Sequence, residues 1–395
     1  MEENKAQQNE IIISNESFEL GTIARIGDKH YQYLEAFDFS KKWVLREIPA
    51  LKQDNFDFSK ESKYHGFTVE PNFINHESVI NNLVNLSEGL VYEPEEGEFP
   101  NTKMLFEHIF GEQIELGYDR FSIILKHPKH IQPILVLASN IQATGKTTFL
   151  NYIDAFFKGN SITMNISVYK DKFNSSYATK LCINIDETII SEDFLKERLK
   201  QNTTSGTINL RLMHKDFSVI PFYGKFTMCT NNELDFAKIE ENDQRFWIRK
   251  PGKINNFDPD FAKKLVNEIP HFLYFLLNRE LSVPKPLGRL WFPNEMLQTD
   301  ALADVVNNSK SDCAKDIEIY FEEQLDKQNR DTIGATATEI CDFLNNKYKI
   351  YQISNTLKHE LKMDNKNRQY QDLRNFTQNG RPYIFTRTID KDLPY

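Results

Sequence analysis

The largely apolar run at residues 131–138 is the feature that most restricts how this chain can fold. An apolar run of this length without alternation is typical of a strand buried on both faces of a sheet. Two similar runs follow at 181–185 and 224–230. Because helical stretches alternate with these runs, the sequence predicts an α/β sheet with both faces covered.

A loop containing one glycine joins the first predicted strand to a helix expected over residues 147–157. The loop reads Ala143-Thr144-Gly145-Lys146-Thr147-Thr148. Backbone N–H groups of such a loop can surround nucleotide phosphates, and the helix N-terminus favours anions. Lys146 would then reach the β- and γ-phosphates of ATP, and the Thr147 hydroxyl would bind Mg²⁺. The alternative is an ordinary helix start that follows a glycine.

The loop departs from the pattern G-x-x-x-x-G-K-[ST] at its first position, where Asn140 replaces glycine. Asn is one of the few residues that tolerate a positive φ. We therefore expect Asn140 to allow the loop to form.

Polar side chains follow the next two predicted strands. Asp186 and Glu187 come after the run 181–185, and Asn231 comes after 224–230. Asp186 is predicted to hold Mg²⁺ and Glu187 to polarise the attacking water as a general base. Asn231 is predicted to contact the γ-phosphate or to orient the water. A solvated acidic turn and a common Asn-Asn turn are the alternatives.

A β-hairpin is expected over residues 203–216, with Arg211, His214 and Lys215 at its tip. Basic groups at such a tip could contact the phosphates of a single DNA strand in a central pore. The alternative is a solvated surface hairpin.

Arg245 is the predicted arginine finger, which would reach the γ-phosphate held by a neighbouring subunit. A structural arginine paired with Asp243 is the alternative, and Arg249 is the second candidate for the finger.

The order of these motifs resembles that of superfamily 3 helicases. More closely, several segments look like the helicase domain of phage-type primase-helicase proteins. They are His127-Pro128-Lys129-His130, Thr144-Gly145-Lys146-Thr147-Thr148-Phe149, Phe173-Asn174-Ser175-Ser176, Asp186-Glu187-Thr188, Gly224-Lys225-Phe226 and Arg245-Phe246-Trp247. The resemblance covers roughly residues 65–255.

The resemblance implies an AAA+ ATPase that forms a hexameric ring, hydrolyses ATP with Mg²⁺ at subunit interfaces and translocates on single-stranded DNA. Asn140 and Ala143 stand where the family has loop glycines, so tight ATP binding is not implied. No primase catalytic domain fits in the first 65 residues, so a separate primase or another replication protein is a possible partner.

The expected fold class is α/β: an AAA+ P-loop ATPase domain between a small N-terminal α+β region and a C-terminal winged-helix-like domain. The expected divisions are a disordered tail over 1–15, the N-terminal region over 16–110, the ATPase core over 111–255, a helical and Pro-rich connector over 256–308 and the C-terminal domain over 309–395. Helices are expected over 76–86, 102–110 and 118–125, and a hairpin around Asn379-Gly380.

Charge is unevenly distributed along the chain. The whole chain has a net charge of −9, which argues against a general basic coat for duplex DNA. Residues 347–387 nevertheless contain nine Lys or Arg and three Asp or Glu, a net of +6. A basic C-terminal domain suits DNA docking or origin recognition, and docking of a protein partner is the alternative.

No run of eighteen or more apolar residues and no signal-like N-terminus is present, so we expect no membrane partner. The four cysteines form no metal-binding or C-x-x-C pattern. These features predict a cytoplasmic protein, and the resemblance implies a bacterial or phage-infected cell.

Two functions fit the motifs. The first is an ATP-dependent DNA helicase or translocase that acts in phage or mobile-element DNA replication. The second is an AAA+ assembly or loading factor, switched by nucleotide, that binds DNA or a replication partner without unwinding.

Overall fold

The computed structural model describes residues 14–15, 17–35, 41–187, 193–203, 205–210, 218–239, 243, 245–255, 258–286, 288–374 and 376–387. The chain divides into two compact units, Met1–Val305 and Val306–Tyr395, and each is treated separately below. No helix in these ranges is long and apolar enough to cross a membrane.

A parallel five-stranded sheet lies at the centre of the described part of the first unit. Its strand order is β11-β12-β15-β10-β16. The strands are β10 (Ile134–Ala138), β11 (Ser161–Asn165), β12 (Cys182–Asp186), β15 (Lys225–Thr230) and β16 (Phe246–Arg249). All described pairings between them are parallel, which confirms the predicted α/β sheet.

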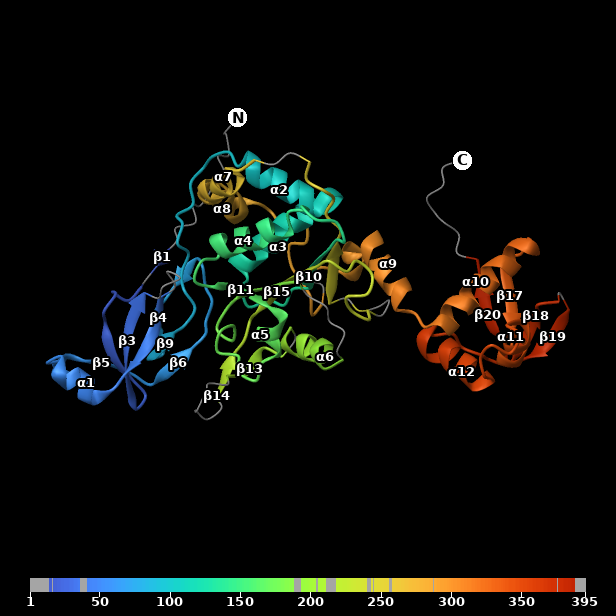
Figure 1. Ribbon diagram of the computed structural model, residues 1–395, viewed down its shortest axis with the longest axis horizontal. Coiled ribbons are helices and arrows are strands. Elements are labelled where there is room, and N and C mark those ends of the chain that lie inside the picture. Colours follow the sequence, from blue (N-terminus) through green and yellow to red (C-terminus); the bar gives the residue numbers. More distant parts are fainter. Residues whose placement is uncertain are drawn as a thin grey trace, which may run out of the picture. The chain divides into compact units, whose positions relative to one another are not determined.

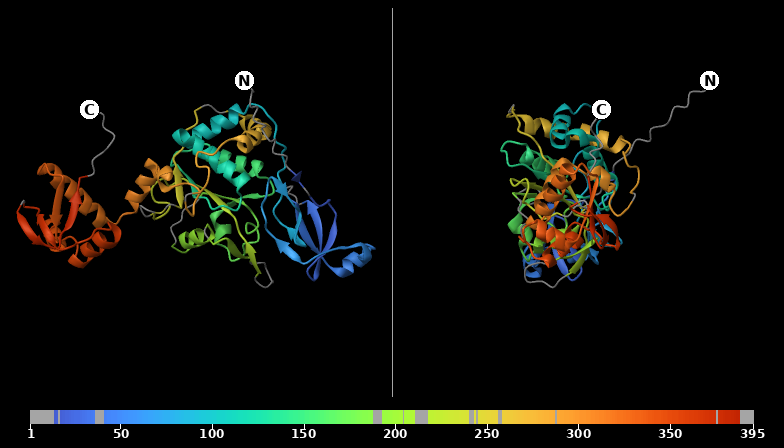
Figure 2. Two further views of the ribbon diagram at one scale, coloured as in Figure 1. Left: turned by 180° about the vertical axis from the view of Figure 1, so that it is seen from behind. Right: turned by 90° about the vertical axis from the view of Figure 1, so that its right-hand side faces the viewer.

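Helices cover both faces of this sheet. Figure 1 shows α2, α3, α4, α7 and α8 on one side and α5 and α6 on the other, and the view from behind in Figure 2 shows the same layers. Their bounds are α2 (Pro100–Phe110), α3 (Ile114–Lys126), α4 (Lys146–Phe156), α5 (Ile166–Lys170), α6 (Asp193–Asn202), α7 (Phe261–Asn267) and α8 (Ile269–Asn278). The helices expected over 102–110 and 118–125 are α2 and α3.

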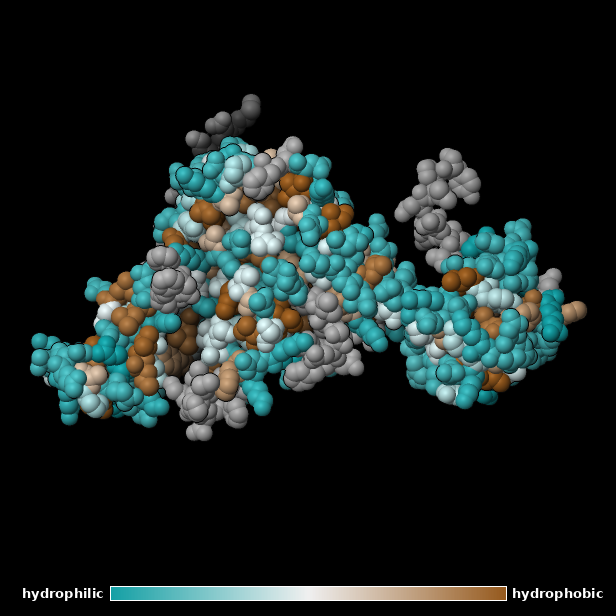
Figure 3. All heavy atoms as spheres, in the orientation of Figure 1, coloured by the Kyte–Doolittle hydropathy of each residue, from teal (hydrophilic) through white to brown (hydrophobic). Residues whose placement is uncertain are grey.

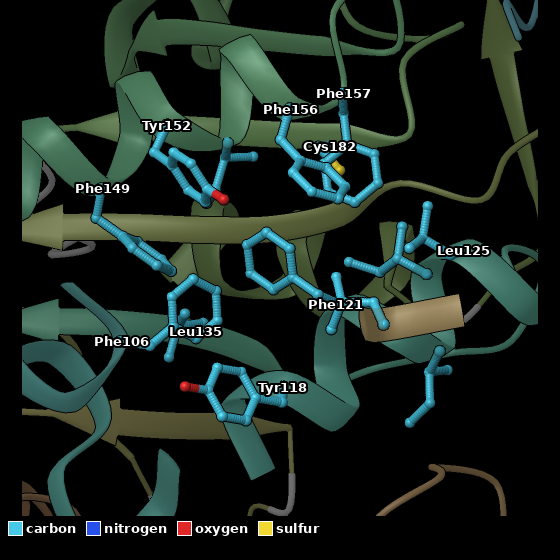
Figure 4. Packing of buried hydrophobic residues seen from close by; sticks show 14 of the residues in the cluster. Phe106, Tyr118, Phe121, Leu125, Leu135, Phe149, Tyr152, Phe156, Phe157 and Cys182 are labelled. Carbon is cyan, nitrogen blue, oxygen red and sulfur yellow. The ribbon is translucent and has the colours of Figure 1, made fainter. Parts of the chain in front are cut away.

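Aromatic rings fill the space between the sheet and the larger helical layer. Phe106 of α2, Phe121 of α3 and Phe149 of α4 are buried and lie close together (Figure 4). Phe272 of α8 is also buried, and these rings meet edge to face or tilted. The centroids of Phe106 and Phe272 are 4.9 Å apart. Burial of each ring contributes about 1.5–3 kcal/mol, and each ring pair adds about 0.5–1.5 kcal/mol. This packing holds α4 firmly on the sheet. The loop that precedes α4, residues 139–145, is called the phosphate loop after its predicted role.

The N-terminal region is made mainly of short strands. One sheet has the order β4-β3-β2-β5 and another has the order β6-β9-β8. The elements are β1 (Ser14–Asn15), β2 (Ile23–Ile26), β3 (Lys29–Glu35), β4 (Lys41–Arg46), α1 (Ile48–Gln53), β5 (Ser62–Tyr64), β6 (Gly66–Thr68), β7 (Asn75–His76), β8 (Val79–Ile80) and β9 (Leu83–Asn85).

The helix expected over 76–86 is wrong. Strands β8 and β9 pair antiparallel there, with Val79 opposite Val84. Asn81 and Asn82 connect them with φ of 50° and 62°. Two consecutive residues with positive φ form the tight turn that a two-residue hairpin needs, and this turn overrides the helical spacing of the apolar residues.

The second unit combines helices with two pairs of antiparallel strands. Its elements are α10 (Asp312–Lys327), β17 (Thr332–Ala335), α11 (Ala337–Phe343), α12 (Ile350–Asn355), β18 (Arg368–Gln371), β19 (Thr377–Gly380) and β20 (Tyr383–Thr386), and α9 (Asp300–Ser309) spans the boundary between the units. β17 pairs with β20, and β18 pairs with β19. The hairpin expected around Asn379-Gly380 is displaced, because these residues lie inside β19 and the connection runs from 372 to 376.

Candidate nucleotide site

The loop after β10 has the backbone geometry of an anion-binding loop. Gly145 precedes α4 with φ of 76°, and Ala143 has φ of 57°. Gly145 has no side chain that could accept hydrogen bonds from the first N–H groups of α4. They are therefore available to an anion. The sequence suggested that Asn140 could replace the missing glycine because Asn tolerates a positive φ. That reason is wrong, because Ala143 and Gly145 adopt a positive φ and Asn140 does not.

Lys146 is the first residue of α4 and is 9% exposed. Its Nζ donates a hydrogen bond to the carbonyl oxygen of Ser139 at 2.8 Å. Burial lowers the pKa of Lys146, and the charges of Asp186 and Glu233 act in the opposite direction. The lysine thus lies at the end of β10, within electrostatic reach of two carboxylates. Thr144 is buried, Thr147 is exposed and Thr148 is half-buried.

Asp186 ends β12, and Glu187 follows it on the surface. Asp186 Oδ1 accepts a hydrogen bond from the Glu187 backbone N–H at 3.0 Å. Glu187 has φ of 53°, a left-handed conformation that costs a non-glycine residue about 1–2 kcal/mol. Strain of this kind accumulates at functional sites. The turn directs two successive carboxylates away from the end of β12.

Asn231 is exposed directly after β15, at the same edge of the sheet as the phosphate loop. Thr230 pairs with Ala138, the last residue of β10. The structure therefore brings the ends of β10, β12 and β15 together, with the side chains of Lys146, Asp186 and Asn231 at one edge. This is the edge at which α/β sheets bind ligands.

Glu233 is a residue of this edge that the sequence motifs did not reveal. Its Oε1 accepts the Asn140 backbone N–H at 2.9 Å, and its Oε2 forms an ion pair with Lys250 Nζ at 2.7 Å. Burial acts to raise the pKa of Glu233, but the hydrogen bonds from Lys250 and Asn140 and the charge of Lys146 lower it overall. Glu233 therefore ties the start of the phosphate loop to β15 as a carboxylate. Only the fold places it there, because the sequence shows one more acid after an Asn-Asn turn.

Two further residues contact the loop from distant parts of the chain. His108 Nε2 lies 3.1 Å from the carbonyl oxygen of Thr144. The backbone N–H of Ile254 donates to the Ala143 carbonyl oxygen at 2.9 Å. A Cβ atom on Gly145 would lie 3.0 Å from Ile254 Cδ1 and 3.7 Å from His108 Cδ2. These contacts require glycine at position 145 and support the left-handed loop from outside.

Arg245 lies at the opposite edge of the same sheet. Its carbonyl oxygen accepts the Ile134 N–H at the start of β10, whereas the phosphate loop follows the end of β10. Five residues of β-strand separate the two edges by roughly 17 Å. The Arg245 side chain is 37% exposed, and its Nε pairs with Asp243 Oδ1 at 3.0 Å. The ion pair offered as the alternative is thus present, and Arg245 is remote from the phosphate loop of its own chain.

Arg249 has a structural role. Its Nη2 donates to the Phe110 carbonyl oxygen at 2.6 Å, and its Nη1 pairs with Glu112 Oε1 at 2.8 Å. The side chain is mostly buried at the C-terminal end of α2, where a cation stabilises the last carbonyl groups. These contacts favour a structural role for Arg249.

The hairpin expected over 203–216 is formed by β13 (Thr207–Leu210) and β14 (Ser218–Pro221), which pair antiparallel. Arg211, His214 and Lys215 lie outside the described residues. Asn174, from the segment Phe173-Asn174-Ser175-Ser176, donates through Nδ2 to the Asn209 carbonyl oxygen of β13 at 2.9 Å. That segment therefore contacts the first strand of the hairpin.

Two other segments that resemble the family pattern contact each other at the N-terminal end of β15. Lys225, at the start of β15, is buried, and its Nζ donates to the carbonyl oxygens of Pro128 and, at 2.6 Å, Tyr223. A Cβ atom on Gly224, just before β15, would lie 2.5 Å from Phe222 Cζ and 2.7 Å from Ile183 Cδ1, so these two side chains would have to move. The segments Gly224-Lys225-Phe226 and His127-Pro128-Lys129-His130 thus stabilise the sheet together.

Comparisons with known proteins agree with this fold. Residues 137–249 match a family described as "Family of unknown function (DUF5906)". No curated protein matches the sequence. The apo structure of the NrS-1 C-terminal region aligns with 91% of this chain and 95% of its own, at 14% identity and a TM-score of 0.64. An A-form apo structure of that region aligns over the same shares at 14% identity and a TM-score of 0.61.

The JCV helicase, in a complex with a small molecule, aligns over 45% of this chain and 52% of its own at 12% identity. Its TM-score of 0.29 is too low to support an argument about fold. The chain is therefore a mixed α/β protein with a parallel sheet, and it has the fold of the NrS-1 C-terminal region.

Proposed function

We propose that this protein is an ATP-dependent helicase or translocase of superfamily 3 type that acts on single-stranded DNA in phage or mobile-element replication. The observation that carries the proposal is the meeting of Lys146, Asp186 and the free N-terminus of α4 at one edge of a parallel sheet. A lysine, a carboxylate and unpaired N–H groups in this arrangement suit a nucleotide triphosphate bound with Mg²⁺.

The donor set fits Mg²⁺·ATP. Gly145 has no side chain that could cover the first N–H groups of α4, so phosphate oxygens would be able to approach the backbone there. Lys146 would leave the Ser139 carbonyl oxygen to bind the β- and γ-phosphates. The exposed Thr147 hydroxyl and Asp186 would hold Mg²⁺, which neutralises the developing charge on the phosphates when bound.

Glu187 is the proposed general base. Its side chain is exposed one residue beyond Asp186, and no hydrogen bond to a described residue ties its carboxylate. Asn231 would contact the γ-phosphate or orient the attacking water without adding negative charge. Glu233, already paired with Lys250, would keep the loop in place.

Arg245 supports a site shared between subunits. Arg245 lies at the N-terminal ends of the strands and is therefore far from Lys146 of its own chain. Its side chain is partly exposed. A neighbouring subunit in a ring, proposed to be a hexamer, would present its phosphate loop to this arginine. Such a finger stabilises charge in the transition state.

The β13–β14 hairpin is the proposed contact with DNA. Arg211, His214 and Lys215 would lie at its tip and face single-stranded DNA in the pore. In the second unit, α10, α11, α12 and the β18–β19 hairpin support a winged-helix-like domain. A separate primase or another replication protein is the proposed protein partner.

The test is the rate of ATP hydrolysis with and without single-stranded DNA. We expect strong stimulation by DNA, and we expect Glu187→Gln to lower the rate by about 10²–10⁴-fold while Mg²⁺·ATP still binds. Glu197→Gln, an equivalent change on the exposed side of α6, is the control and should hydrolyse ATP normally.

A rate that does not respond to DNA would contradict the translocase. It would favour the second candidate, an AAA+ factor that uses nucleotide as a switch for assembly or loading. Loss of Mg²⁺·ATP binding in Glu187→Gln would contradict the assignment of Glu187 as a base.

A further inference from the structure

Charge in the second unit is divided between its two halves. Residues 306–346 contain four Lys or Arg and nine Asp or Glu, a net of −5. Residues 347–387 contain nine Lys or Arg and three Asp or Glu, a net of +6. The positive half begins just before α12 and includes the β18–β19 hairpin. Figure 3 shows that the visible surface of this unit is largely hydrophilic.

Helix α12 has one buried face and one exposed face. It continues without a break into a π-helical turn, Thr356–Glu360, so the helical stretch covers 350–360. Ile353 and Leu357 are fully buried in the core of the unit. The exposed face consists of residues at helical spacing, namely Tyr351, Asn355, Lys358 and His359. Lys358 supplies the positive charge of this face, and the exposed side chains of Ile350 and Tyr351 lie at its N-terminal end.

The carboxylates of the positive half are used within the unit. Both oxygens of Glu360 accept hydrogen bonds from Ser311, at 2.6 and 2.8 Å. Asp364 pairs with Lys366 at 3.0 Å and with Arg368 at 2.8 Å. Asp372 accepts the backbone N–H groups of residues 374 and 376 in the hairpin connection.

Lys349, Lys358 and Lys362 lie before, on and after the helical stretch, and all three are exposed. None of them pairs with a carboxylate among the described residues. Their charge is therefore available to an anionic partner. Lysine is depleted in protein–protein interfaces, so this surface suits nucleic acid better than protein.

We infer that the exposed face of α12 docks into the major groove of duplex DNA. The groove of B-DNA admits an α-helix, and Asn at an exposed helix position can read adenine there. Asn355 would contact base edges, and Lys349, Lys358 and Lys362 would contact phosphates on either side. This site differs in place and in ligand from the single-strand contact proposed at the β13–β14 hairpin, and it does not depend on ATP hydrolysis.

The experiment measures binding of the full chain to a duplex of roughly 30 base pairs, about three helical turns, and to a single strand of the same length. Fluorescence anisotropy is recorded over a series of salt concentrations. In the variant Lys358→Ala/Lys362→Ala, duplex affinity at 0.1 M salt should fall by about tenfold per lysine. The slope of log affinity against log salt should become shallower by about two.

Lys327→Ala is the matched control, because it removes one exposed lysine from α10 in the negative half. Its duplex affinity should equal that of the wild type. Asn355→Ala should keep the salt slope but lose about five- to hundredfold in preference for a duplex selected from a random pool. Single-strand binding and DNA-stimulated ATP hydrolysis should be unchanged in every variant.

An unchanged duplex affinity in Lys358→Ala/Lys362→Ala would overturn the inference. Equal losses for duplex and single strand would also overturn it, because they would indicate a general phosphate contact. A failure of the proposed ATPase would leave these binding outcomes intact. Circular dichroism and thermal unfolding check that each variant is folded.

Discussion

Lys146 and Lys225 are both buried lysines, but they lie at opposite edges of one parallel sheet. Lys146 is 9% exposed, feels the charges of Asp186 and Glu233, and donates to one carbonyl oxygen in a loop with open N–H groups. Lys225 is 3% exposed and donates to two carbonyl oxygens. Burial lowers the pKa of Lys225 to about 7.

The neighbours of Lys225 explain this difference. Arg120 is also buried, and it donates to the carbonyl oxygens of Pro133 at 2.8 Å and Phe226 at 3.0 Å. Burial lowers the pKa of Arg120 to about 10 and raises that of the Cys182 thiol to about 12. At the N-terminal ends of the strands, Lys225 and Arg120 thus donate their hydrogen bonds to backbone carbonyl oxygens. At the C-terminal ends of the strands, Lys146 has a single hydrogen bond to a carbonyl oxygen and feels the charges of two carboxylates. Burial of a lysine alone therefore does not identify a functional site.

The largest expected effect concerns Arg245, which has a catalytic role only if the amino edge of one subunit meets the carboxyl edge of another. Arg245→Ala should lower ATP hydrolysis by about 10³–10⁵-fold, because charge in the transition state loses its partner. Mixing Arg245→Ala subunits with Lys146→Ala subunits should restore part of the activity, since each kind supplies the residue that the other lacks. The measurement is the steady-state rate over a series of mixing ratios, and no recovery at any ratio would contradict a shared site.

Lys146→Met tests the carboxyl edge. Loss of the phosphate contact should lower hydrolysis by at least about 10²–10³-fold. The melting temperature should change little, because a methionine can fill the same space and the Ser139 carbonyl oxygen lies next to the open loop. Rates and thermal unfolding are measured on the same preparation. A large loss of stability would mean that Lys146 holds the fold as Lys225 does.

Lys225→Met tests the N-terminal end of β15 through the pH dependence of the free energy of unfolding. In the folded state the pKa is about 7, well below the ordinary 10.5, so the folded amine is neutral at pH values where the unfolded lysine still carries a proton. The cost of folding is therefore complete below pH 7 and decreases as the pH rises towards 10.5. Two hydrogen bonds to carbonyl oxygens match the two N–H bonds of a neutral amine.

Between pH 7 and 9, the free energy of unfolding of the wild type should rise relative to that of Lys225→Met by about 1.4 kcal/mol per pH unit. The unfolded thiol of Cys182 ionises in the same range in both proteins, so its contribution cancels in this difference. Urea unfolding at a series of pH values gives the comparison. Parallel curves for the two proteins would show that Lys225 stays protonated in the folded state.

The smallest effect is expected at Ala143, where the phosphate loop has a left-handed residue with a side chain. Ala143→Gly should be neutral or stabilise the protein by up to about 1 kcal/mol, because relief of strain competes with the greater freedom of glycine in the unfolded chain. Ala155→Gly, inside α4, should destabilise it by about 1 kcal/mol. Equal losses in both variants, measured by urea unfolding, would indicate that Ala143 is not strained.

The sequence predicted the fold best where fully buried strands are each followed by a residue of the predicted site. Apolar runs without alternation predicted β10, β12 and β15, and these strands carry the residues expected at the carboxyl edge. Strand β11, Ser161–Asn165, was missed because it is only partly buried and carries polar residues. Strand β16 was missed because its apolar run is only Phe246-Trp247-Ile248 before Arg249 ends the strand, and only the structure shows that this arginine binds the end of α2.

Contacts between distant segments could not be predicted. Glu233, His108 and Ile254 reach the phosphate loop from a turn, a helix and a coil, and no spacing in the sequence relates them to Gly145. The turn at Asn81-Asn82 was missed because the apolar spacing around it fits a helix equally well, and the backbone decides between the two.

The strand order β11-β12-β15-β10-β16 has a consequence for how the chain folds during synthesis. Both neighbours of β10 come from later parts of the sequence, Lys225–Thr230 and Phe246–Arg249. Until the ribosome has released these segments, the apolar strand before the phosphate loop has no partner in the sheet. Such non-local pairing slows folding and leaves an aggregation-prone strand exposed. The nascent chain should therefore need a chaperone most while the segment between β10 and β16 is being made.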